Sequence, residues 1–301
     1  MGDKNQILSQ AKSYLNQLLQ RTSPQKSIDW LYQQCEKINT AGSETKLFLA
    51  FSQASRHFSK DPWILTEEEI EAADSVRKGF MPQKWNSLRA ARCFLLLQAV
   101  SEENDKWLSL MDTLFETADM HEQEALYGAL PLLPFPEKLT KRASEGLRTN
   151  ITSVFDAVAL DNPYPADHLD EKAWNQLVLK AIFLQRPLYR IIGADGRANK
   201  DLANTLVDYV HERWSAGREV FPELWRFVGP YLDDDAVSLF KKVLKSGTEL
   251  EKQAAGLALR ANGSSAALSL LEPYPEIKAA LDLGGINWSS IGKEYYKKGT
   301  V

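Results

Sequence analysis

The sequence predicts an all-α protein, arranged as stacked helical pairs in a HEAT-like or irregular α-solenoid array. Apolar residues recur at spacings of three and four almost everywhere, whereas clear strand-like alternation does not. Proline- and glycine-rich segments interrupt the pattern at LPFPEK (133–138), NPYP (162–165) and GADGRAN (193–199). Towards the C-terminus, short helices are separated by SGT and NGS, and EQEALYGAL (122–130) echoes EKQAAGLAL (251–259), which favours repeated helical pairs.

The expected helices follow from this spacing and from their end signals. Thr66 followed by Glu69 is typical of a capping box, in which each side chain bonds the backbone N–H of the other residue. Asn199 closes its loop and is the expected N-cap of the next helix. In chain order, the expected helices cover 7–19, 27–38, 66–76, 84–100, 104–117, 122–133, 137–159, 170–184, 201–216, 235–245, 249–261 and 265–271.

The composition is that of a soluble globular protein. Of 301 residues, 44% are hydrophobic and 25% charged, and the net charge is −4. This mild balance argues against a general nucleic-acid binder, which usually has a basic face. We expect one helical domain over 1–301, with N-terminal helices in 1–120, a central core in 120–230 and helical pairs in 231–301.

Cysteine usage and the absence of targeting signals predict a cytoplasmic protein. Cys35 and Cys93 are isolated and form no CxxC motif, so both are expected to be reduced, structural thiols. The N-terminus lacks the apolar centre of a secretory signal, and Gln6 stands where a myristoylation signal needs Ser or Thr. No stretch has the ~20 apolar residues of a membrane helix, so no direct membrane insertion is expected.

Known catalytic and metal-binding templates fail one by one. HERWS (211–215) begins like a zincin motif, but Ser215 replaces the second histidine. The acids at 233–235 lack the further aspartate of a magnesium motif and suit a helix N-terminus instead. Gly292 and Lys293 lack the rest of a phosphate-binding loop, and no G-x-S-x-G occurs. No catalytic residue, metal or cofactor is therefore assigned.

The stretch DYVHERWSAGREVFPELWR (208–226) leaves two interpretations open. A helix over 201–216 places Asp208, His211 and Glu212 opposite its apolar side, either as a solvated face or as a polar wall that holds a cation or polar ligand. Arg213 and Arg218 suit carboxylate or phosphate recognition, or they pair with nearby glutamates. We expect one wall of a polar-lined pocket, which Val210 and Trp214 anchor to the core.

The preceding helix, DEKAWNQLVLKAIFL (170–184), is apolar around most of its circumference and is expected to be buried. It nevertheless carries Gln176 and Lys180 one turn apart. A buried lysine must find a carboxylate or lose its proton. Three interpretations of Lys180 are therefore open: it pairs with an acid such as Asp208 or Glu212, it faces a ligand, or it extends its ammonium to solvent. A lysine with a lowered pKa could also form an imine with a carbonyl substrate, which is the least favoured interpretation.

Aromatic residues are dense over 155–227, beside several amide and guanidinium side chains. Core packing explains most of them, although the combination also suits a pocket with apolar walls and a few polar groups. The candidate ligand-binding residues are Trp174, Asn175, Gln176, Lys180, Arg197, Asn199, Asp208, His211, Glu212, Arg213, Arg218 and Trp225.

Four segments resemble the EboA family of metabolite traffic proteins. They are GALPLLPFPEKLTKRASEGLRTNITSVFDAVA (128–159), NPYPADHLDEKAWNQLVLKAIF (162–183), DGRANKDLANTLVDYVHERWSAGR (195–218) and VFPELWRFVGPYL (220–232). The resemblance implies a helical cytoplasmic protein belonging to a set that moves a secondary-metabolite precursor towards the periplasm. That set includes a membrane prenyltransferase-like protein and proteins that resemble hydrolases, sugar isomerases and dehydroquinate synthases. The resemblance assigns no reaction to this member.

Three functions remain open at this point. The first is a non-catalytic carrier or adaptor that binds a small aromatic or prenylated metabolite, or other proteins of the pathway, among them the prenyltransferase-like protein. The second is an enzyme of unknown reaction built on Lys180, Asp208, His211 and Glu212. The third is a pure protein–protein scaffold. Polar residues on an otherwise buried helix favour the first two, because scaffolds rarely need them.

Overall fold

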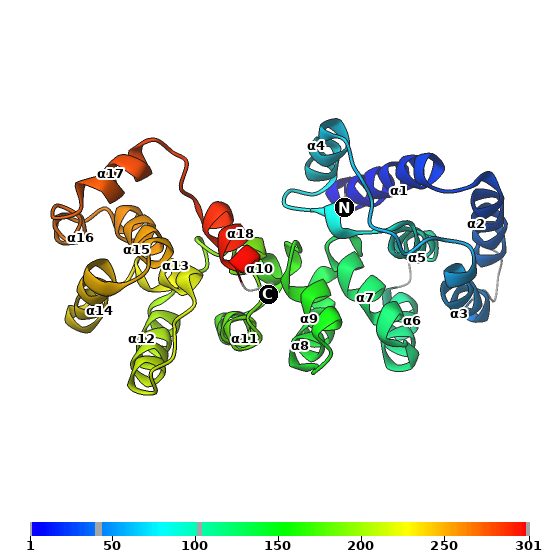
Figure 1. Ribbon diagram of the computed structural model, residues 1–301. Coiled ribbons are helices and arrows are strands. Elements are labelled where there is room, and N and C mark those ends of the chain that lie inside the picture. The colour runs from blue at the N-terminus through cyan, green and yellow to red at the C-terminus, as the bar shows by residue number, and fades with distance from the viewer. Residues whose placement is uncertain (1, 40–43, 101–103, 299–301) are drawn as a thin grey trace. The chain divides into compact units, whose positions relative to one another are not determined.

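The computed structural model describes residues 2–39, 44–100 and 104–298, and within them the protein is all-α, as the periodicity predicts (Figure 1). No β-strand occurs in this described part, where the β-type pairing is one isolated bridge between Pro62 and Asn86. The chain divides into two compact units, Met1–Leu169 and Asp170–Val301. The single-domain organisation and the stacking of helical pairs into an array stay predictions.

The first unit packs around α5, which is buried along nearly its whole length. Helices α1, α2, α3 and α7 contact α5, and α7 in turn packs against α9. The α-helices of this unit are α1 (Gly2–Thr22), α2 (Gln25–Ile38), α3 (Glu44–Gln53), α4 (Glu67–Val76), α5 (Ser87–Gln98), α6 (Asn104–Thr117), α7 (Met120–Ala129), α8 (Thr140–Arg148), α9 (Thr152–Ala159) and α10 (Tyr164–His168). Four 3-10 turns connect them: η1 (Ala54–Arg56), η2 (Pro82–Lys84), η3 (Leu130–Leu132) and η4 (Pro136–Lys138).

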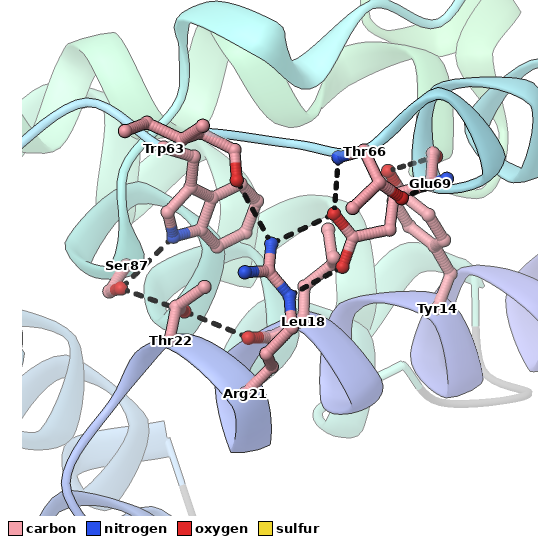
Figure 2. A network of polar contacts seen from close by, with 9 residues as sticks. Tyr14, Leu18, Arg21, Thr22, Trp63, Thr66, Glu69 and Ser87 are labelled. Carbon is pink, nitrogen blue, oxygen red and sulfur yellow. Dashed lines mark hydrogen bonds and ion pairs between the residues drawn. The ribbon is translucent and has the colours of Figure 1, made fainter.

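A polar network fastens α4 to α1 in this unit (Figure 2). The Arg21 guanidinium donates to both carboxylate oxygens of Glu69, at 2.5 and 2.8 Å, and to the carbonyl of Ile64 at 3.1 Å. The hydroxyl of Tyr14 donates to the Glu69 carbonyl at 2.9 Å. Because Glu69 also completes the N-terminal cap of α4, the same residue both starts that helix and positions it.

The second unit packs around α15, which contacts α13, α14, α17 and α18. Its α-helices are α11 (Glu171–Phe183), α12 (Lys200–Ser215), α13 (Trp225–Val228), α14 (Asp234–Ser246), α15 (Glu249–Asn262), α16 (Ser265–Ser269), α17 (Pro275–Asp282) and α18 (Trp288–Lys298). Two 3-10 turns, η5 (Leu188–Arg190) and η6 (Pro222–Leu224), lie between helices.

End signals predict several helices well. The helix expected over 104–117 has those bounds, and the capping box of Thr66 and Glu69 is confirmed, with both reciprocal bonds present. The single helix expected over 137–159 is wrong. It breaks between α8 and α9, where Thr149 takes an extended backbone and its hydroxyl accepts from the N–H of Ile151. Such short-range side-chain bonds compete with the helix ladder.

Other elements depart from the sequence expectation. The segment NPYP does not only end a helix: it also starts the short α10, since proline is tolerated in a first helical turn. Helices α3, α13, α17 and α18 also lie outside the expected set. Cys35 and Cys93 are free and buried as expected, and burial raises the pKa of both thiols, that of Cys35 to about 11. Across the described residues, every helix is too short or too polar to cross a bilayer.

Candidate functional site

All twelve residues predicted to bind a ligand lie in the second unit, but the structure distributes them over separate places. Asn175 of α11 and Asn199 bond each other through their amides in both directions, at 3.1 and 2.7 Å. Asn199 is the N-cap of α12, as predicted, and its side-chain oxygen accepts from the N–H of Leu202 at 2.9 Å. The hydrogen bonds of these amides therefore connect the start of α12 to α11.

The two tryptophans of the predicted set belong to the core. Trp174 and Trp225 are both 0% exposed, and neither indole N–H finds a hydrogen-bond partner. The Arg197 guanidinium lies 5.0 Å from the ring centre of Trp174, within cation–π range. Trp225 packs against Phe240 and Trp214, with ring centres 4.9 and 6.2 Å apart. The ring contacts of Trp225 therefore join α12, α13 and α14.

The face of α12 opposite its buried side chains is exposed, as the amphipathic pattern predicts. Asp208, His211 and Glu212 are exposed, while Val210 is fully buried, as the predicted anchor should be. The imidazole of His211 lies 3.1 Å from both carboxylate oxygens of Asp235 on α14, an acid outside the predicted set. The second predicted anchor, Trp214, is half-buried, and its indole ring faces α14.

The remaining predicted residues are half-buried or exposed. Arg213 donates to the backbone carbonyl of Glu219 at 3.0 and 2.9 Å, rather than to a carboxylate. Gln176 and Arg218 are exposed. Lys180 is half-buried, and burial lowers its pKa. Among the described residues, no three His, Cys, Asp or Glu side chains lie close enough to hold a metal ion.

The expectation of a fully buried α11 is wrong at its C-terminal end. Phe183 is 72% exposed and Leu184 is 39% exposed, although Ala181 and Ile182 just before them are buried. The Phe183 ring meets Tyr209 edge-on, with ring centres 5.8 Å apart. The sequence pattern counts both as apolar positions, but only the folded chain determines which side of α11 is covered.

The most unusual polar group of the unit is Glu223, which is 0% exposed. It lies in η6, within the apolar run VFPELW, where Pro222 favours the first turn and the neighbouring side chains enter the core. One carboxyl oxygen, Oε2, accepts from the backbone N–H of Leu188 at 3.2 Å, and the N–H of Tyr189 also donates to the carboxyl. The other oxygen, Oε1, is buried without a hydrogen-bond partner.

Burial governs the protonation of this carboxyl. Removal from water raises the pKa of Glu223 to about 8, although the two backbone N–H groups and the charge of Arg226 oppose the rise. Near neutral pH the group is therefore mostly a neutral acid, and it can donate a hydrogen bond as well as accept one. A carboxyl poised in this range is characteristic of functional sites.

Arg226, one turn after Glu223, is the second polar group of the site. Its Nε and Nη2 donate to the two oxygens of Asp195, at 2.5 and 2.7 Å. Its Nη1 is buried and unpartnered, like Oε1 of Glu223. The guanidinium also lies 5.9 Å from the ring centre of Trp288 on α18. Two neighbouring side chains thus each keep one unused hydrogen-bonding atom.

Helix α18 covers this pair of residues. It packs on η5, η6 and α15, and its Ile291 and Gly292 are buried. A side chain at Gly292 would collide with Tyr189 and would lie 3.0 Å from the carboxyl carbon of Glu223. We call the buried carboxyl of Glu223, the guanidinium of Arg226 and the rings of Tyr189 and Trp288 the Glu223 site.

The sequence contains one signal for this site. A lone glutamate in an apolar run raises the same question that Lys180 raises on α11, because a buried charge must be paired or neutralised. The aromatic residues of the site, Tyr189 next to Glu223 and Trp288 next to Arg226, are distant from this pair in sequence, and no local pattern connects them to it.

Comparison with known proteins adds one match. The family model described as metabolite traffic protein EboA matches residues 11–229, which reach well beyond the segment 120–230 and span parts of both compact units. The matched region contains Glu223 and Arg226 and ends before α18. No curated protein and no solved structure matches the chain.

Proposed function

Because the chain belongs to the EboA family of metabolite traffic proteins, we propose that it is a cytoplasmic, non-catalytic carrier that binds a small metabolite at the Glu223 site. It passes a secondary-metabolite precursor to other proteins of its pathway, including a membrane prenyltransferase-like partner. The family supplies the context of metabolite traffic, and the Glu223 site supplies the chemistry.

The observation that carries this proposal is the unused hydrogen-bonding capacity of Glu223 and Arg226. An unpaired buried polar atom costs about 1–3 kcal/mol, so two neighbouring ones favour a partner that supplies the missing bonds. A neutral carboxyl and a guanidinium both donate to oxygen acceptors. The ring of Trp288 lies beside Arg226, and a side chain at Gly292 would touch both Tyr189 and Glu223. The ligand class is therefore a molecule with a carbonyl, hydroxyl or carboxylate oxygen on an apolar or aromatic body.

The test is native mass spectrometry of the gently purified protein after incubation with a small-molecule extract of the cells that encode it. We expect one discrete added mass on the wild type, absent after denaturation. Arg226→Lys keeps the charge but loses the two-pronged donor, so it should lose that mass. Arg142→Lys is the matched control: both arginine side chains are little exposed, 11% and 13%, and both pair with exposed carboxylates.

Two results would overturn the carrier proposal. One is a wild-type protein that gains no mass from any extract fraction. The other is an added mass that Arg226→Lys retains as fully as Arg142→Lys does.

A second candidate is an enzyme that uses Glu223 as a general acid or base, favoured by its pKa near 8, since proton transfer at neutral pH needs a group that titrates nearby. The set first considered for catalysis has less support, because His211 is paired with Asp235 on another helix. Conversion of the bound compound by wild type, lost in Glu223→Gln while binding persists, would establish the enzyme instead of the carrier.

A further inference from the structure

Helix α18 is joined to the rest of its unit by a segment that offers little resistance to movement. Residues 283–287 connect it to α17, and Leu283 at the start of this connection is 87% exposed (Figure 1). Gly284 takes a positive φ of 73°, and a side chain at Gly284 or Gly285 would meet nothing within 4 Å. Such residues absorb backbone rotation readily.

Aromatic contacts help to hold α18 in its docked position. Phe221 meets the rings of Tyr295 and Tyr296 edge-on, with centres 4.9 and 6.0 Å apart. The Tyr296 hydroxyl donates to the carbonyl of Gln185 at 2.8 Å. With Ile291 buried as well, α18 closes a largely apolar interface over one carboxyl, so the charge state of that carboxyl bears directly on docking.

The groups that face Glu223 come from each element packed against it. Arg226 is the charged neighbour on its own segment, Tyr189 faces it from η5, and Tyr296 faces it from α18. Beyond Tyr296 lie Arg186 and Tyr295, and Glu251 of α15 acts on Tyr295. Among these, Arg226 is the cation that acts directly on Glu223, and it already holds Asp195.

We infer that α18 is a proton-responsive cover: it closes over Glu223 when the carboxyl is neutral and opens when the carboxyl ionises. The use of this movement, to admit and release a ligand, rests on the proposed function, whereas the movement itself does not. Closed α18 lies against the carboxyl carbon at the position of Gly292, so a ligand that reaches Glu223 requires the cover to move.

The direction follows from the two protonation states. The covered carboxyl has a pKa of about 8, whereas a glutamate carboxyl in water has 4.5. Opening returns water to the carboxyl and lowers its pKa, so the covered state binds the proton more tightly and closing is strongest at low pH. Below about pH 8, each unit of pH raises the open-to-closed ratio by up to about tenfold, and above about pH 8 the ratio becomes constant.

Hydrogen–deuterium exchange of the ligand-free full chain tests the inference. We would follow the α18 amides from pH 5.5 to 8.5 in the wild type and in Glu223→Gln. Glutamine keeps an acceptor for the Leu188 N–H and cannot ionise. The exchange ratio between the two proteins cancels the intrinsic effect of pH. We expect this ratio to rise with pH, by up to about tenfold per pH unit, and to level off near pH 8, for α18 alone.

A second variant keeps the test decisive if Glu223→Gln folds poorly. Gly292→Ala should displace α18 at every pH through its collision with Tyr189, leaving protection in α14 and α15 intact. Wild-type α18 should then approach the Gly292→Ala rate at pH 8.5 and not at pH 5.5. A ratio independent of pH, or a rise shared equally by all helices of the unit, would overturn the cover. Because no ligand is present, this failure would leave the carrier proposal standing.

Discussion

Replacing Glu223 with glutamine should change how the stability of the protein depends on pH. The pKa of about 8 in the folded protein lies above the ordinary value of 4.5, so the folded state holds the proton more tightly. The stability that the neutral carboxyl contributes is complete below pH 4.5 and is lost as pH rises through 8. At 1.36 kcal/mol per unit of pKa difference, ionisation of this carboxyl in the unfolded chain lowers the stability of the folded state by about 3 kcal/mol at pH 7, but by less than about 1 kcal/mol at pH 5.

Glutamine does not ionise in this pH range. The free energy of unfolding of Glu223→Gln should therefore rise relative to that of the wild type by about 2 kcal/mol between pH 5 and pH 7. Urea denaturation at a series of pH values, followed by circular dichroism, measures both free energies of unfolding. Glu219→Gln, which alters an exposed glutamate of the same unit, is the control. A gap between wild type and Glu223→Gln that stays constant from pH 5 to pH 8 would refute the reasoning. If α18 opens as inferred, the loss of stability with rising pH should stop once it equals the free energy with which α18 docks on its unit.

Three further substitutions test the packing. Glu122→Gln removes the carboxylate charge that pairs with the guanidinium of Arg92, whose side chain is 3% exposed. It should lower the free energy of unfolding by about 2 kcal/mol in a urea titration. An unchanged midpoint would contradict this. Thr66→Ala removes the cap of α4 and should cost about 1 kcal/mol, seen as a lower Tm, whereas Thr66→Ser should recover most of it. Gly229→Ala should cost roughly 2 kcal/mol by calorimetry, because its methyl group would lie 2.6 Å from Cβ of Ala258; a neutral result would show that α13 and α15 can separate.

Local signals predict much of this fold, because local chemistry determines where many helices begin. Thr66 and Asn199 both act as N-caps as the sequence indicates, and the solvated face of α12 follows from its periodicity. The same kind of signal fails where neighbours decide the outcome. Thr149 ends α8 through a short-range bond, and Phe183 is exposed although its own helix looks apolar throughout.

The candidate site is harder to predict for the same reason. The residues singled out by polarity, such as Asp208 and His211, are exposed on α12, and periodicity alone indicates that exposure. Glu223 attracts less notice, because one acid among large apolar residues carries no motif. Its importance arises from burial beneath α18, whose sequence WSSIGKEYYKK has few apolar positions. No spacing rule connects Gly292 to Glu223, and only the folded chain brings them together.

The family match covers one part of the proposed site and leaves out another. The matched region holds Glu223 and Arg226, the groups that offer hydrogen bonds, while the cover lies beyond its end at residue 229. A carrier needs both to hold its ligand and to release it, and these demands conflict when one rigid pocket must meet them. The conflict is resolved if the core supplies the hydrogen-bonding groups and a separate helix excludes water. The cover can then open without unfolding the residues that bind the ligand. The protonation of a single carboxyl would then set the balance between holding and release.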